Sequence, residues 1–297
     1  MTTSEQIADL LDQLQNQTGI RFAITDNQAD EEETILILKN MLRAQHDGTS
    51  RESFLRGLLL GLLTPQEIAE GIRRFHIDND ALIFPILIET RQPFSALEQS
   101  VVLQLFSSGA DTVIMIDDCH IALLRRIPQP LDERAMHQMI RDIQNTLETE
   151  AMVSMNLAYD GTVTSMDQLP GVFLTISTTL EICHVFAPTQ HICWAHDLGL
   201  GKLIYQLPTD ICEEYLKDHF HGLHMEDIDE ETLHTIHVFL ESGLSIAECA
   251  RHLYLHRNTL IYRLDKIEQL TGLDIRKFDD AMTCKVALMI SSYLQQK

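Results

Sequence analysis

Residues 245–270 read SIAECARHLYLHRNTLIYRLDKIEQL, and this stretch decides how the rest of the chain is interpreted. Ser245 and Glu248 have the S-x-x-E spacing of a capping box, in which each side chain accepts a hydrogen bond from the other residue's backbone N–H. Apolar residues then recur at i, i+3, i+4 and i+7, the spacing of one buried helix face: Ile246, Cys249, Ala250 and Leu253. A tight turn follows at residues 254–256, where His256 is placed to cap the next helix. The pattern predicts two helices joined by a short turn.

The second of these helices is expected to have one apolar side and one polar side. At 100° per residue, Leu260, Leu264 and Ile267 fall on one side. Polar groups occupy the opposite side and the first turn, at Arg257, Asn258, Thr259, Tyr262, Arg263 and Lys266. Such groups suit base edges in a major groove and the phosphates that flank it, so the pattern predicts a DNA-binding helix-turn-helix. The spacing alone also allows an ordinary amphipathic hairpin with a solvated charged face.

Two longer segments, FLESGLSIAECARHLYLHRNTLIYRL at residues 239–264 and KIEQLTGLDIRKFDDA at residues 266–281, lie within the region 231–294. This region resembles the C-terminal DNA-binding domain of the PucR/CdaR transcription regulators, the purine-catabolism and sugar-diacid group. The most specific agreement is HRNTL at 256–260, followed by YRL at 262–264 and TGLD at 271–274. The resemblance implies DNA contacts from a set of residues on one helix: Arg257, Asn258, Thr259 and Arg263, with Tyr262 and Lys266 beside them.

The formal net charge of −22 lies outside the predicted DNA-binding region. Residues 231–297 carry 8 Lys+Arg and 8 Asp+Glu, which leaves 14 basic and 36 acidic groups in the first 230 residues. An acidic body repels phosphates and keeps non-specific affinity for DNA low. We therefore expect a homodimer, in which two recognition helices read two half-sites a whole number of helical turns apart.

Length and composition point to a soluble, cytoplasmic, multidomain protein. The chain has 297 residues, of which 45% are apolar, and this allows two or three domains. No uninterrupted apolar run reaches the roughly 18 residues that span a bilayer, and the N-terminus lacks the pattern of a signal peptide. Six scattered cysteines without a C-x-x-C pair predict reduced thiols. No membrane partner is expected.

The middle of the chain has a different texture, which begins with the continuous apolar run ALIFPILIE at residues 81–89. Strands are predicted at 81–89, 111–116, 120–127, 151–159 and 191–197. Helices are predicted between and after them, at 95–108, 131–150, 169–186 and 198–207. This order predicts an α/β sandwich with helices packed on a mixed sheet. It also resembles the degenerate GGDEF-like domain that precedes the DNA-binding domain in CdaR-type regulators.

The fold class predicted from these patterns is an α+β multidomain protein with three parts. Residues 1–78 form a helix-rich N-terminal segment, in which Thr64 caps a helix that begins at Pro65. Residues 79–222 form the α/β sandwich, and residues 228–297 form the all-α helix-turn-helix domain.

Two other kinds of site were weighed against this interpretation. A nucleotide cyclase of the GGDEF type needs glycines in its hairpin, and the hairpin at 116–120 has none, although Glu89 could form an acidic pair with Asp117 or Asp118. The histidines at 219, 221 and 224, with the carboxylates that follow them, could bind zinc or nickel, but a solvated linker is favoured there. The sequence therefore predicts no catalytic residue, no metal site and no cofactor.

The function predicted from the sequence is a sequence-specific transcription regulator that binds DNA through residues 256–270. The family resemblance favours activation of a catabolic or metabolite-responsive operon, and a small-molecule effector is compatible with this role. The alternative is a nucleotide-binding or diguanylate-cyclase-like enzyme with an attached DNA-binding domain.

Overall fold

A computed structural model of the chain describes residues 50–106, 111–220 and 228–296. Contacts within the chain divide it into two compact units: residues 1–180 with 190–197, and residues 181–189 with 198–297. The described part has mixed α+β structure with one sheet, as the sequence predicts. The elements predicted before residue 50, and the histidines at 221 and 224, lie outside the described residues.

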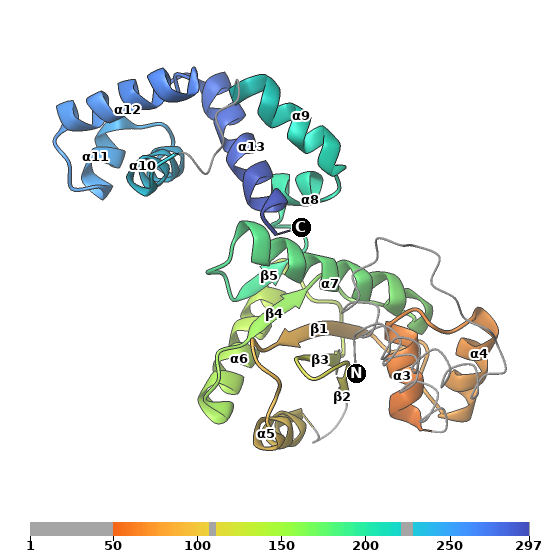
Figure 1. The fold of residues 1–297 in the computed structure, drawn as a ribbon. Coiled ribbons are helices and arrows are strands. Elements are labelled where there is room, and N and C mark those ends of the chain that lie inside the picture. Colours follow the sequence, from red (N-terminus) through yellow and green to blue (C-terminus); the bar gives the residue numbers. More distant parts are fainter. Residues whose placement is uncertain (1–49, 107–110, 221–227, 297) are drawn as a thin grey trace, which may run out of the picture. The chain divides into compact units, whose positions relative to one another are not determined.

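The first unit is built on a five-stranded sheet with the order β2-β3-β1-β4-β5 (Figure 1). Its strands are β1 (Ile83–Glu89), β2 (Thr112–Met115), β3 (His120–Arg126), β4 (Asn156–Tyr159) and β5 (Ile192–Trp194). The central strand β1 pairs antiparallel with β3 and β4, whereas β4 and β5 are parallel. Antiparallel β2 and β3 form the predicted hairpin.

Alternating side chains of the strands separate the two faces of this sheet. Ile121 and Leu123 of β3 belong to a core cluster with residues of α5 (Ala96–Phe106) and α6 (Glu133–Ala151). Their neighbours Ala122 and Leu124 are also buried and point to the opposite face. That second face is approached by α3 (Arg51–Leu59) and α7 (Leu169–Phe186) (Figure 1). Burial of both faces explains why β1 is a continuous apolar run.

Helix starts follow the capping chemistry of the sequence, as α4 (Pro65–Arg74) shows. The Thr64 hydroxyl accepts a hydrogen bond from the Glu67 N–H at 3.4 Å, and the Glu67 carboxylate accepts one from the Thr64 N–H at 2.7 Å. The prediction of a cap at Thr64 and a first helical residue at Pro65 is confirmed. Gly71 lies so close to the ring of Phe54 that an added Cβ would approach it to 2.0 Å, so only glycine fits there.

Two element boundaries differ from those predicted. The strand predicted over 151–159 is limited to β4, because α6 continues to Ala151 and ends at Met152, whose left-handed φ of 57° closes the helix. A helix that was not predicted, α9 (Thr209–Phe220), follows α8 (Gly199–Tyr205). Its apolar periodicity is weak because acidic residues interrupt it.

The second unit is helical and contains α8, α9 and the C-terminal helices. The helix α13 (Phe278–Leu294) buries Ile290 and Tyr293 against α8 and α9. The Tyr293 hydroxyl donates to the backbone carbonyl of Tyr205 at 3.2 Å. Thus α8 and α9, which fall inside the predicted segment 79–222, pack with α13. The predicted domain boundaries remain a proposal.

Helix α7 and the turn before it, Met166–Phe186, are long and apolar enough to cross a membrane by length and composition. Leu169, Phe173 and Ile176 of this helix are almost fully buried within the first unit.

The cysteines correct one expectation from the sequence. Four of them are free thiols, Cys119, Cys212, Cys249 and Cys284, whereas Cys183 and Cys193 are disulfide-bonded. The prediction of reduced thiols is wrong for these two in this structure. Spacing along the chain does not show which sulfur atoms the fold brings within bonding distance.

Candidate nucleic-acid interface

The predicted helix-turn-helix is present in the second unit and is drawn in blue in Figure 1. Its helices are α10 (Glu230–Glu241), α11 (Ile246–His252) and α12 (Arg257–Thr271). One core joins these helices to α13. It includes Cys249 and Ala250 of α11 and Leu260, Leu264 and Ile267 of α12. The apolar faces predicted for both helices are therefore confirmed. The core contacts fix α12 through its apolar face, and the other sides of the helix are accessible to solvent.

Helix α11 begins as predicted, but with half of the expected capping box. The Ser245 hydroxyl accepts a hydrogen bond from the Glu248 N–H at 3.3 Å. The return bond is absent among the described contacts, because the Ser245 N–H donates to the carbonyl of Ser242 and the Glu248 carboxylate pairs with Arg251. The cap still defines where the helix starts.

The turn between the two helices places a large aromatic residue in a strained conformation. Tyr254 has a φ of 54°, in the left-handed region that favours glycine, and its side chain is 96% exposed. The backbone closes when the Leu255 N–H donates to the Ala250 carbonyl at 2.8 Å. His256 then caps α12, as predicted, by accepting a hydrogen bond from the Asn258 N–H at 3.3 Å.

The first turn of α12 presents polar side chains to solvent. Arg257, Asn258 and Thr259 are exposed, and Tyr262 on the next turn is 71% exposed. Within the described part of the chain, these four side chains make no hydrogen bond or ion pair. No acidic residue lies in the first turn, so the positive end of the helix dipole is not offset there. The arrangement is suited to phosphate oxygens and base edges.

Arg263 and Lys266 are placed differently from the other four predicted residues. The Arg263 guanidinium donates to the Glu231 carboxylate at 2.6 Å and to the Thr235 hydroxyl at 3.3 Å. The Lys266 ammonium lies 3.4 Å from the Asp229 carboxylate. Both cations therefore lie on the flank of α12 that faces the acidic start of α10.

The Asp229 carboxylate is also the cap of α10. Hydrogen bonds from the N–H and the hydroxyl of Thr232, together with the nearby Lys266, lower the pKa of Asp229. Its negative charge is consequently maintained at neutral pH beside the recognition helix. A ligand phosphate that approaches Lys266 competes with this carboxylate.

The other flank of α12 carries anions, and these are neutralised within the unit. Arg276 donates to Asp265 at 2.7 Å, to Glu268 at 2.6 Å and to Asp274 at 2.5 Å. The hydrogen bond with Arg276 lowers the pKa of Asp274. Arg276 thus ties α12 to the loop before α13 and offsets two negative charges on the recognition helix.

The structure therefore brings Arg257, Asn258, Thr259 and Tyr262 together on one accessible surface. Arg263 and Lys266 lie beside this surface in ion pairs. Periodicity alone did not distinguish the two groups, because partners on α10 are distant in sequence. The sequence pattern placed Tyr254 in the turn but did not identify it as a candidate site residue. The feature that points to it is a bulky side chain at a position where a tight turn favours glycine.

The hairpin of the first unit is the second location where polar groups gather. His120 lies between two carboxylates: its Nδ1 is 2.8 Å from Asp117 Oδ1 and its Nε2 is 3.2 Å from Glu89 Oε1. Burial alone would lower the pKa of His120, but hydrogen bonds to Asp117 and Glu89 outweigh it and raise the pKa to about 9. Asn156 donates to the remaining Glu89 oxygen at 2.9 Å. The His120 imidazolium therefore lies between the Glu89 and Asp117 carboxylates, in the space that a divalent cation bound by both would occupy.

Comparison with known proteins agrees with the geometry of the second unit. Residues 232–290 match the PucR C-terminal helix-turn-helix domain. The purine catabolism regulatory protein of Bacillus subtilis is 32% identical over 121 residues, which is 40% of this chain and 23% of that protein. The carbohydrate diacid regulator of Escherichia coli is 30% identical over 118 residues, which is 40% of this chain and 31% of that protein. The matches thus span less than a third of either relative.

A solved structure, the regulator of polyketide synthase expression from Bifidobacterium adolescentis, aligns with 86% of this chain and 98% of its own. Its TM-score is 0.40 and its sequence identity is 17%.

Proposed function

We propose that this chain, which contains a PucR C-terminal helix-turn-helix domain, is a transcription regulator that binds specific DNA sequences as a homodimer. The observation that carries the proposal is the first turn of α12. Arg257, Asn258 and Thr259 are exposed at a helix N-terminus whose opposite side is locked in a core. A recognition helix reads bases with its N-terminal residues in this way.

Each side chain has a distinct role in the proposed complex. Arg257 can donate two parallel hydrogen bonds to a guanine edge or to a phosphate, and Asn258 can pair with an adenine edge. Thr259 and Tyr262 are placed for phosphate or base contacts on the same surface. Arg263 and Lys266 contribute when DNA phosphates replace Glu231 and Asp229 as their partners.

The remaining parts of the proposal follow the family resemblance. The protein is cytoplasmic and activates a catabolic or metabolite-responsive operon in answer to a small-molecule effector. The first unit is a degenerate GGDEF-like domain without enzymatic activity, a proposal supported by its order of strands and helices and by a hairpin without glycine. The engagement of Glu89 and Asp117 by His120 argues against the alternative of an active cyclase.

Equilibrium binding of the full chain to DNA from its own upstream region tests the proposal, with labelled fragments at several salt concentrations. Arg257→Ala is expected to weaken specific binding by about 1–3 kcal/mol, which is roughly 5- to 150-fold. The matched control is Arg134→Ala, which removes the same charge from an exposed position on α6. Equal affinities of the two variants for specific DNA would contradict the proposed recognition surface.

A further inference from the structure

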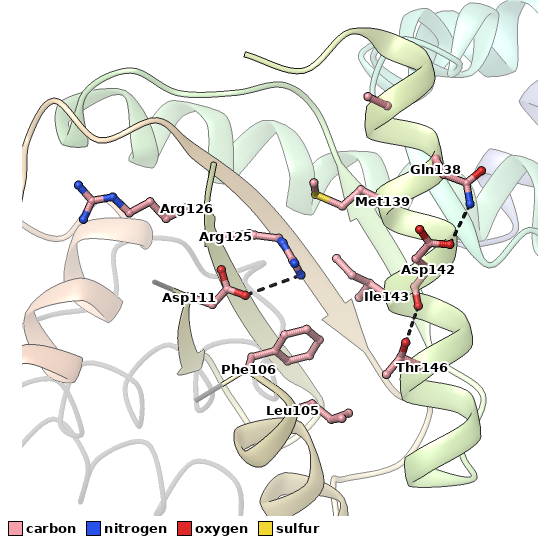
Figure 2. Close-up of a pocket in the computed structure, with 11 residues that line it drawn as sticks. Leu105, Phe106, Asp111, Arg125, Arg126, Gln138, Met139, Asp142, Ile143 and Thr146 are labelled. Carbon is pink, nitrogen blue, oxygen red and sulfur yellow. Dashed lines mark hydrogen bonds and ion pairs between the residues drawn. The ribbon is translucent and has the colours of Figure 1, made fainter. Parts of the chain in front are cut away.

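A cavity of about 800 Å³ opens in the first unit between α5, the β2–β3 hairpin and α6 (Figure 2). Its volume lies within the range of about 300–1,000 Å³ that is typical of small-molecule sites. It lies away from the His120 cluster, at the end of β3 that is remote from the hairpin turn. It has an apolar wall, a polar rim and a guanidinium directed into it, and a second arginine, Arg126, also lines it.

The guanidinium belongs to Arg125, and the alternation of β3 directs it into the cavity. Ile121 and Leu123 point from β3 into the core beneath α5 and α6, and Arg125 is the next residue of that row. Figure 2 shows its side chain reaching toward the space between Asp111 and α6. Its neighbour Arg126 also lines the cavity, but its guanidinium is engaged by Asp78 in an ion pair.

Most of the hydrogen-bonding capacity of Arg125 is unused. Its one ion pair among the described residues joins Nη1 to Asp111 Oδ2 at 3.7 Å, which is longer than the 2.7–2.9 Å of a charge-assisted hydrogen bond. A guanidinium has five N–H donors. The Arg125 side chain is 34% exposed, so a ligand can reach these donors from the cavity.

The wall beside Arg125 is apolar. Phe106 of α5 and Ile143 of α6 form its buried part, and Leu105 and Met139 are half-buried around them. Across the opening, Gln138 donates to the Asp142 carboxylate at 2.8 Å, and both residues are exposed. A molecule in this cavity would therefore meet the Arg125 guanidinium, a hydrocarbon surface and a solvated rim, with the second guanidinium, that of Arg126, already paired with Asp78.

We propose that this cavity binds a small organic monocarboxylate with an apolar body of about six carbons. The carboxylate accepts hydrogen bonds from the free N–H groups of Arg125, and the apolar body packs on Phe106 and Met139. A single negative charge fits better than a dianion, because Asp111 and Asp142 repel a second charge. In the proposed regulator such a ligand would be the effector; that role rests on the proposed function, whereas binding itself does not.

Titration of the full chain with benzoate and hexanoate tests the site, with benzamide and hexanamide as neutral probes of the same shape. Binding is followed by ligand-observed nuclear magnetic resonance, which detects millimolar affinities. We expect both carboxylates to bind at least tenfold more tightly than their amides. We expect Arg125→Gln to abolish this preference and Asp111→Asn to strengthen carboxylate binding, because it removes the competing anion.

The matched control is Arg73→Gln, which makes the same change at an exposed position of α4 outside the lining of the cavity. Carboxylate binding should be unchanged in this variant. Failure of either carboxylate to bind in preference to its amide, or equal losses in the Arg125 and Arg73 variants, would overturn the proposed site.

The same protein samples separate this inference from the proposed function. Arg257→Ala should weaken DNA binding without changing carboxylate binding, since the two surfaces share no residue. If carboxylates bind through Arg125 but leave the affinity for DNA unchanged, the ligand site stands and its role as an effector site does not. If Arg257→Ala leaves DNA binding intact while carboxylate binding still depends on Arg125, the proposed DNA-recognition surface is wrong. The proposed carboxylate site is then still supported.

Discussion

At the scale of single residues, strain and charge mark the positions with functional interest. A non-glycine residue in the left-handed region costs roughly 1–2 kcal/mol, and such cost is common at functional sites. Tyr254 is in that region with its ring almost fully in solvent, so no packing of the ring offsets the cost. Contact of the ring with DNA would explain a tyrosine at this position.

The first prediction compares Tyr254→Gly with Tyr254→Ala. Glycine relieves the backbone strain and alanine does not, so the glycine variant should be about 1 kcal/mol more stable in chemical denaturation. Both variants lose the ring, so both should bind specific DNA more weakly than the original chain by a similar factor of roughly 5. Unchanged DNA affinity in both would show that the tyrosine serves another purpose.

The second prediction concerns the pH dependence that His120 gives to stability. Its folded pKa of about 9 lies above the ordinary value of 6.5, so its contribution is complete below about pH 6.5 and is lost as the pH rises through 9. Asp117 has a lowered pKa, because the hydrogen bond and charge of His120 outweigh its burial. Asp117 therefore stabilises the folded state above about pH 3.8, its ordinary pKa. This stabilisation is lost as the pH falls through the lower pKa that Asp117 has in the folded state.

Urea unfolding of the original chain and of His120→Gln at pH 6 and pH 10 measures this effect. The variant should be less stable by about 1–3 kcal/mol at pH 6, and the difference should shrink markedly at pH 10. A difference of the same size at both pH values would mean that His120 contributes through its shape and not through its charge.

At the scale of elements, the pairing of α10 with α12 controls which cations DNA can use. Arg263 is bound to Glu231 and Thr235, and Lys266 lies beside Asp229. Glu231 and Asp229 are solvent-exposed carboxylates, so the two ion pairs contribute little to stability. They do compete with phosphate for the same cations, which reduces binding to DNA that offers only phosphates.

The third prediction is that Glu231→Gln increases affinity for DNA. The change frees Arg263 for phosphate, so binding should strengthen by roughly 2- to 10-fold and its dependence on salt should steepen by about one phosphate contact. Stability should change by less than about 0.5 kcal/mol. Glu230→Gln removes the same charge in the same turn without a partner on α12, and it should have a smaller effect. Equal effects of both variants would indicate general electrostatics in place of the specific pair.

At the scale of the whole molecule, the distribution of charge argues for an assembly. The first 230 residues hold the entire net charge of −22, so a single helix-turn-helix works against repulsion by the rest of the chain. Two recognition helices on one DNA site double the specific contacts, and the homodimer proposed above provides them.

The fourth prediction is that the chain has the mass of two protomers in light scattering and protects two half-sites on DNA. The half-site centres should be separated by about 10–10.5 base pairs or a multiple, on one side of the duplex. Insertion of about five base pairs between them should weaken binding strongly, whereas insertion of a full turn should weaken it less. A monomeric mass with no response to half-site spacing would contradict the assembly.

The sequence by itself determined the elements whose signals are local. The cap at His256, the apolar faces of α11 and α12 and the strand β1 all follow from spacings of a few residues. These signals are reliable because capping and periodic burial depend on neighbours within one or two turns.

Only the tertiary structure decided which side chains meet across the fold. It placed Arg263 against α10, left Arg257 free, and set His120 between Glu89 and Asp117. It also joined α8 and α9 to α13 and opened the cavity at Arg125. These contacts link residues far apart in the chain, and their geometry follows from packing of whole elements, which no local pattern specifies.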